Sequence, residues 1–123
     1  METNTISGIV VDAAMKVHSR LGPGLLESAY QACLAYELHK RGLKVLTQVE
    51  LPVTYDEVRL DIGYRVDLLV EDCVLVELKV VRKLLPVHEA QLLSYLKLSG
   101  YWAGLLINFH VARLKDGIRR MVS

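Results

Sequence analysis

Residues 64–80 read YRVDLLVEDCVLVELKV, and their alternation of apolar and polar residues predicts the centre of the fold. Apolar residues occupy the even positions of both halves, starting further back at Leu60 and Ile62, which is typical of two β-strands with one buried face. Polar residues between the halves indicate a chain reversal, so we expect an antiparallel hairpin. The other polar residues have odd numbers and therefore share the opposite face of their strands: Arg65, Asp67, Glu77 and Lys79.

The length of the loop sets which residues of this hairpin face each other. A two-residue loop would pair odd with even positions and split the apolar set between core and solvent. A three-residue loop over 71–73 instead pairs Val70 with Val74, so that Asp67 faces Glu77. We therefore expect Arg65 to face Lys79, and the acidic pair to lie on the face opposite to four apolar residues: Val66, Leu68, Val76 and Leu78.

The expected pairing of Asp67 with Glu77 is unfavourable unless something bridges the two carboxylates. Side chains of like charge that face each other about 5 Å apart repel. A divalent cation between them removes the repulsion, and Mg²⁺ prefers such oxygen ligands. Lys79, one strand step further, could stabilise developing negative charge or orient an attacking water. The competing interpretation is a set of diagonal ion pairs on a solvated face.

The rest of the chain predicts an α/β domain around this hairpin. The apolar spacing and the positions of Gly and Pro predict helices over residues 6–21, 25–41 and 87–99. Thr5 is the expected N-cap of the first helix. Strands are expected over residues 45–53, 60–70, 74–80 and 102–109. Pro52 indicates an edge strand or the end of a strand, and the last strand is expected to be buried on both faces. Residues 111–114 and 118–122 predict a final small hairpin, so the order is α-α-β-β-β-α-β with a short β tail.

Length and composition favour one globular domain spanning residues 1–123, because 52% of the residues are hydrophobic. No apolar run approaches the length of a membrane span, and the first residues do not resemble a secretory signal. We therefore expect a cytoplasmic protein in which Cys33 and Cys73 are reduced, small apolar residues. The net charge of +1 does not point to nucleic acid, but an acidic metal site would mask basic residues elsewhere.

The hairpin residues resemble a known signature. Asp67, a gap of nine residues and then Glu77-Leu78-Lys79 are similar to the Asp…(Asp/Glu)-x-Lys signature of the PD-(D/E)XK nucleases. Residues 24–30 read GLLESAY, which looks like the Gly-x-x-Glu-x-x-Tyr motif of the GxxExxY family, a prokaryotic branch of that superfamily. Three further segments also resemble this family: residues 64–69, 86–93 and 105–109. The likeness extends from about residue 6 to residue 122.

The resemblance implies a restriction-endonuclease-like core, a mixed sheet flanked by helices, and roles for particular residues. It implies that Asp67, Glu77 and Glu27 bind the metal, that Lys79 is the catalytic lysine, and that Gln91 is a polar residue facing the site. Simpler interpretations remain open for two of them. An acid such as Glu27 in the first turn of a helix is favoured by the helix dipole in any case, and Gln91 could be a surface amide.

Other side chains are candidates for substrate contacts: Arg65, Tyr30, Tyr95, Arg82 and Lys83. Each has an ordinary structural alternative. Tyr30 could be a core residue, Tyr95 could pack in the core or at its rim, and the basic residues could form a solvated face. Tyr101 and Trp102 could stack on bases, but Trp102 opens a strand predicted to be buried, so we expect it in the core.

Together these features predict an Mg²⁺- or Mn²⁺-dependent nuclease that hydrolyses phosphodiester bonds of DNA, or alternatively RNA, by a metal-activated water. A homodimer is expected by analogy, because duplex DNA has pseudo-twofold symmetry. Two other functions stay open. One is a non-catalytic module that binds nucleic acid or protein. The other is a hydrolase of a small phosphodiester, which would need a closed pocket.

Overall fold

The computed structural model describes the backbone of residues 1–123 and all side chains except those of residues 61 and 62, so the expected burial of Ile62 lies outside the described residues. The elements are α1 (Thr3–Leu21), α2 (Glu27–Lys40), β1 (Val45–Tyr55), β2 (Val58–Val70), β3 (Val74–Lys79), α3 (Pro86–Ser99), β4 (Ala103–Asn108), the 3₁₀ turn η1 (Leu114–Gly117) and β5 (Ile118–Val122). This order confirms the fold class predicted from the sequence.

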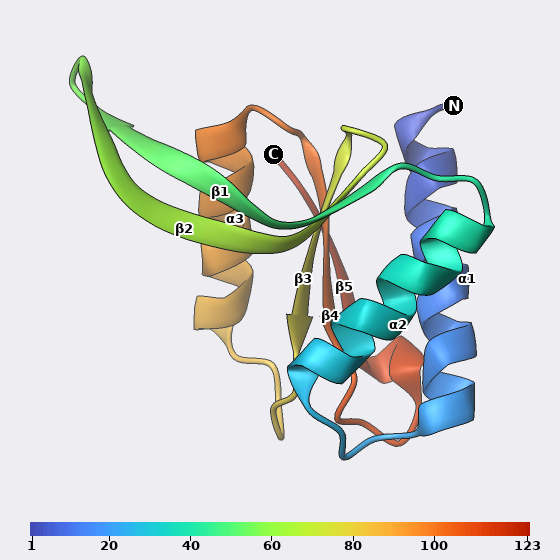
Figure 1. The fold of residues 1–123 in the computed structure, drawn as a ribbon. Helices are drawn as coiled ribbons and strands as arrows, with labels where there is room; N and C mark the ends of the chain where they lie inside the picture. The colour runs from blue at the N-terminus through green and yellow to red at the C-terminus, as the bar shows by residue number, and fades with distance from the viewer.

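The β-sheet is sandwiched between helices, with α1 and α2 on one face and α3 on the other (Figure 1). Within the described chain its strand order is β1-β2-β3-β4-β5. Only β3 and β4 pair in parallel, because α3 connects them. One core cluster packs Leu68 and Leu78 against α1 and α2, and the second packs Leu75 and Leu106 against α3. Residues of both parities along β3 are therefore buried.

Several local predictions differ from the structure. α1 begins at Thr3, so Thr5 lies inside the helix and is not its N-cap. Residues 111–114 form no strand, and β5 pairs with β4 in place of the predicted terminal hairpin. Trp102 was expected to open the buried strand and lie in the core. It instead precedes β4, whose residues are all buried, and is 46% exposed. The edge position indicated by Pro52 is confirmed, since β1 is an edge strand whose register shifts next to this proline.

β1 and β2 form a long hairpin that curves across α3 and projects beyond it (Figure 1). We call residues 51–64 of this hairpin the β1–β2 arm. Tyr55 and Val58 at its tip are exposed. Tyr64, which the parity of β2 placed in the core, is 45% exposed, because it lies in the arm, where its ring rests against that of Tyr95 of α3 and leaves one side open. The predicted burial of the even positions therefore fails at Tyr64.

Both cysteines have free thiols, as expected. Cys33 and Cys73 are partly buried and pack at the border of the core cluster on the α1 and α2 side. Among the described helices, none is long and apolar enough to cross a membrane.

Candidate active site

The predicted acidic pair lies where β2 separates from β3. Their ladder pairs Val70 with Val74, as the three-residue loop requires, and ends at Leu68 and Val76. One step further, side chains replace the backbone bonds. The Asp67 backbone N–H donates to Glu77 Oε1 at 2.9 Å, and the Leu78 N–H donates to Asp67 Oδ2 at 2.8 Å. Asp67 and Glu77 are therefore cross-strand neighbours, as expected.

The separation of the strands overturns two details of the predicted register. Val66 packs in the α3-side cluster, whereas Leu68 packs in the cluster on the other face, so the two residues do not share a face. The β2–β3 ladder does not continue to Arg65 and Lys79. Arg65 instead pairs with Glu50 of β1 and forms an exposed ion pair with it at 3.4 Å. β2 therefore leaves the regular alternation at Asp67.

Gln48 of β1 holds Asp67 at this bend. Its neighbours Thr47 and Val49 both pair with β2, which places Gln48 opposite Asp67. Its backbone φ is 52°, a left-handed conformation that costs residues other than glycine on the order of 1–3 kcal/mol. Gln48 Nε2 donates to Asp67 Oδ1 at 3.1 Å and to Gln31 Oε1 of α2 at 2.6 Å. Sequence reasoning missed this residue, since glutamine is no marker of a positive φ.

The acidic pair is buried, and its two carboxylates are difficult to ionise together. Asp67 is 7% exposed and Glu77 is 6% exposed. Burial raises the pKa of Glu77 to about 8, and the neighbouring charge of Asp67 contributes to this rise. The hydrogen bond from the Asp67 N–H and the positive charge of Lys79 oppose it, but they do not cancel it. Near neutral pH the pair therefore favours a bound proton or a cation.

Glu27 is the first residue of α2, whose N-terminal end lies beside the end of β3 (Figure 1). Its side chain reaches solvent, yet partial desolvation raises the pKa of Glu27. The charge of Asp67 raises this pKa further, while Lys79 lowers it. Glu27 is thus close enough to both residues to interact with them. This agrees with the expected approach of the helix end to the acidic pair, and the role of Glu27 in the site stays a prediction.

Lys79 ends β3, and its side chain extends toward α3. Its Nζ lies 3.4 Å from Gln91 Oε1, so the structure brings Gln91 to the site, as the resemblance implied. The backbone of Lys79 is fixed by β4, because it pairs with Asn108 and its carbonyl accepts a 3.0 Å hydrogen bond from the Phe109 N–H. The base of the lysine is therefore held by two backbone contacts, and its ammonium group by the longer contact with Gln91.

Asn108 is a second residue that sequence reasoning missed. It is 1% exposed, its Nδ2 donates to the Val81 carbonyl at 2.8 Å, and its Oδ1 accepts from the Val81 N–H at 3.1 Å. These bonds hold the chain that follows Lys79. Gly117 closes over the same point, where a Cβ atom would lie 2.3 Å from the Asn108 carbonyl oxygen. An amide at the end of a wholly apolar strand was the available signal.

Tyr30 is not a substrate contact, because its side chain is fully buried. Its ring stacks on Phe109 with centroids 4.4 Å apart, and its hydroxyl donates to the Gly22 carbonyl at 2.5 Å and accepts from the Leu25 N–H at 3.2 Å. The backbone of Gly22 and Gly24 has positive φ in this loop. The tyrosine of the Gly-x-x-Glu-x-x-Tyr motif therefore anchors the loop that presents Glu27.

Tyr30→Phe is expected to destabilise the protein by about 1–3 kcal/mol, because the Leu25 N–H and the Gly22 carbonyl lose a part-buried partner while ring packing is kept. Chemical denaturation measures this. Tyr36→Phe is the matched control, since Tyr36 is 63% exposed on the same helix and should change stability little. Equal stability of the two variants would mean that water replaces the Tyr30 hydroxyl without cost.

The remaining candidates for substrate contacts lie around this centre. Arg82 and Lys83 are exposed on the loop between β3 and α3, and no ion pair involves them among the described side chains. Tyr95 is 5% exposed and lies on α3 beside Gln91. It therefore contributes to the wall of the site and little to its open surface.

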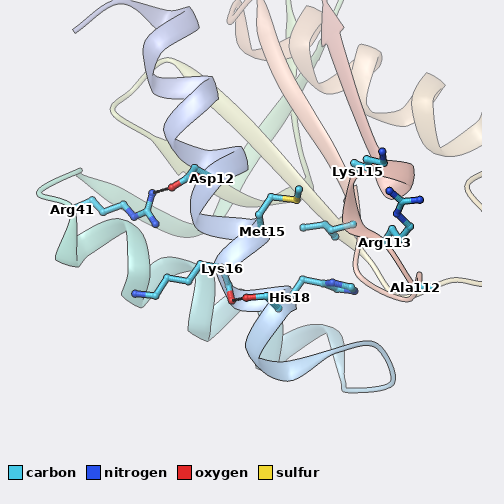
Figure 2. A pocket seen from close by; sticks show the side chains of 10 residues that line it. Asp12, Met15, Lys16, His18, Arg41, Ala112, Arg113 and Lys115 are labelled. Carbon is cyan, nitrogen blue, oxygen red and sulfur yellow. Dashed lines mark hydrogen bonds and ion pairs between the residues drawn. The ribbon is translucent and has the colours of Figure 1, made fainter.

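A separate depression of about 700 Å³ lies on the outer side of α1 and contains none of these residues. In Figure 2, Arg41 turns toward Asp12, while Arg113 and Lys115 lie on the opposite wall. Arg41 Nη1 is 2.6 Å from Asp12 Oδ2, so its charge is already paired. The positive charges do not converge there, and we assign this depression no site.

The donor set at the acidic pair fits a hard divalent cation. Among the described residues, no three acidic, His or Cys side chains converge into a ready-made metal site. Mg²⁺, however, is commonly held by one or two carboxylates, with waters and substrate phosphates completing its shell. Asp67 and Glu77 supply such a pair. The raised pKa of Glu77 reflects the free energy needed to ionise it beside Asp67, and a bound cation would lower that free energy. Glu27 is the nearby third acid.

The fold and this site define a class of protein. The sequence profile of the PD-(D/E)XK nuclease superfamily matches residues 4–121, nearly the whole chain. The chain therefore belongs to the PD-(D/E)XK nuclease superfamily. No curated protein and no solved structure shows a significant match to it.

Proposed function

We propose that this protein is a metal-dependent nuclease that hydrolyses phosphodiester bonds of nucleic acid, with DNA favoured over RNA. The observation that carries the proposal is the buried Asp67–Glu77 pair, which lies next to Lys79 at the separation of β2 and β3. An arrangement that served stability alone would gain from removing one of the two charges. Membership of a nuclease superfamily supports the choice of nucleic acid as substrate.

The residues of the site divide the work of this reaction. A bound Mg²⁺ or Mn²⁺ would activate water and polarise the phosphate. Asp67 and Glu77, with Glu27 as a third ligand, hold the cation, and Gln48 keeps the Asp67 carboxylate in place. Lys79 provides positive charge for the negative charge that develops on the phosphate, and Gln91 orients the lysine. Arg65, Arg82 and Lys83 contact the substrate backbone.

The proposal extends to the branch of the superfamily, the cellular compartment, the oligomeric state and the size of the substrate. The chain is a member of the GxxExxY branch, as residues 24–30 suggest, and the loop anchored by Tyr30 gives that motif a structural reason. It acts in the cytoplasm, which the free thiols of Cys33 and Cys73 support. It acts as a homodimer on duplex DNA, by the symmetry argument. A small-molecule phosphodiester is less favoured, because Gln91 lines a surface groove, between α3 and the β1–β2 arm, that is open and does not form a closed pocket.

A panel of linear duplex, branched, single-stranded DNA and RNA, incubated with Mg²⁺ and with Mn²⁺, tests the proposal. We expect cleavage of at least one nucleic acid that depends on the cation and stops when the cation is chelated. Asp67→Asn should abolish it, whereas Asp12→Asn, which changes an exposed carboxylate far from the site, should not. Metal-independent cleavage would overturn the metal-dependent mechanism, whereas binding of nucleic acid without any cleavage would favour the non-catalytic module.

A further inference from the structure

An open groove of about 520 Å³ runs between α3 and the β1–β2 arm, and its volume lies in the range of ligand sites. The residues lining it include Val53, Tyr64, Gln91, Ser94, Tyr95 and Lys97. The α3 residues Gln91, Ser94 and Tyr95 recur at helical spacing, so one side of this helix forms a wall of the groove.

The groove presents an aromatic surface that is not buried in the core. The ring of Tyr64 leans on that of Tyr95, with centroids 5.7 Å apart and planes inclined by 47°. Tyr95 is 5% exposed and belongs to the α3-side core cluster, so it supports its neighbour rigidly. Tyr64 is 45% exposed and lines the groove. Its accessible ring surface can therefore stack against a flat ligand.

The groove is continuous with the candidate active site. Gln91 lines the groove and also accepts the hydrogen bond from Lys79 Nζ at 3.4 Å. Further along α3, Lys97 is exposed and takes part in no ion pair among the described side chains. A chain of phosphates that passes the site and enters the groove would therefore meet a polar amide, an aromatic ring and an unpaired positive charge.

We propose that this groove binds an unpaired nucleotide of single-stranded nucleic acid, with its base stacked on Tyr64 and a neighbouring phosphate near Lys97. Every base offers a π-face, so such binding tolerates sequence. A duplex keeps its bases stacked inside and presents mainly phosphates to this surface. The inference rests on the proposed function and narrows its substrate to single strands, or to duplexes with a frayed or single-stranded segment beside the scissile bond.

Fluorescence anisotropy in EDTA tests the inference without requiring cleavage. The probes are a labelled oligothymidylate, an oligouridylate of the same length, and a hairpin duplex of mixed sequence. We expect the unmodified protein to prefer the single strands. Tyr64→Ala should weaken single-strand binding by about tenfold, equivalent to about 1.4 kcal/mol, and leave duplex binding unchanged. Tyr64→Phe should retain the affinity, because the ring remains.

Tyr36→Ala is the matched control, since it removes an exposed tyrosine from α2, which covers the opposite face of the sheet. Thermal unfolding of both variants verifies that they are folded. An unchanged single-strand affinity in Tyr64→Ala, or an equal loss for single strand and duplex, overturns the inference even if the protein cuts duplex DNA. Single-strand binding that depends on Tyr64, in a protein that cuts none of the panel, upholds the inference and overturns the proposed nuclease function.

Discussion

Lys79→Ala is expected to lower metal-dependent cleavage by about 10²–10³-fold, the usual cost of removing one group that stabilises negative charge in a transition state. Lys79 lies within electrostatic range of Glu77 and Glu27, so its charge lies near the carboxylates that would hold the cation. The side chain is only partly buried, and its contact with Gln91 is long, at 3.4 Å. Its removal should therefore cost activity and little stability.

The measurement is the initial cleavage rate at saturating Mn²⁺, together with the Mn²⁺-dependent rise in melting temperature. Lys79→Ala should keep the rise in melting temperature, because lysine does not ligate the cation. Lys115→Ala is the matched control, since it removes an exposed lysine from η1, away from the candidate site. If Lys79→Ala cleaves as fast as the control, Lys79 acts only as an ion-pair partner of the acidic residues.

The regular part of the fold could be predicted because local patterns determine it. Parity and loop length fixed the β2–β3 register, since any slip would have exposed the apolar residues Val70 and Val74. Helical spacing and the Gly and Pro positions located three helices. The same parity put Asp67 beside Glu77, so that the centre of the candidate site followed from the hairpin alone.

The departures from regularity were not predictable, because long-range contacts cause them. The bend at Asp67 depends on the left-handed backbone of Gln48, some twenty residues earlier, and on its bond to Gln31 in α2. This bend also turns Val66 toward α3. Parity assumes a straight strand, so it failed for Tyr64, which lies beyond the bend in the arm. The motif marked Tyr30, but only the packed loop shows that its hydroxyl is structural.

The metal-free protein is expected to lose stability as the pH rises from about 4.5 to about 8. An unfolded glutamate titrates near 4.5, whereas the pKa of Glu77 in the fold is about 8. Between these values the folded chain holds a proton that the unfolded chain has lost, so unfolding releases it and a higher pH favours unfolding. The stabilising contribution is complete below this window and absent above it. Its loss is on the order of 3–5 kcal/mol, at about 1.4 kcal/mol per pH unit.

Glu77→Gln isolates this effect from the titration of other groups. The amide cannot ionise, yet its oxygen can still accept the hydrogen bond from the Asp67 N–H. The free energy of unfolding of this variant should therefore change less with pH, and above pH 8 the variant should be more stable than the unmodified metal-free protein. Asp12→Asn is the control, because it alters an exposed ion pair of small energetic value and should keep the full pH dependence.

Mn²⁺ should offset much of the loss, because a cation between the two carboxylates takes the place of the proton. At a hundredfold excess over its dissociation constant it should add about 2.7 kcal/mol to the stability of the unmodified protein and of Asp12→Asn. Glu77→Gln and Asp67→Asn each lack one charge of the pair and should respond little. Denaturant unfolding at several pH values, with and without Mn²⁺, gives all of these quantities. A metal-free protein whose stability is flat or rises across this window would mean that Glu77 is ionised in the fold, most simply through an ion pair with Lys79, and the case for a cation between Asp67 and Glu77 would then be lost.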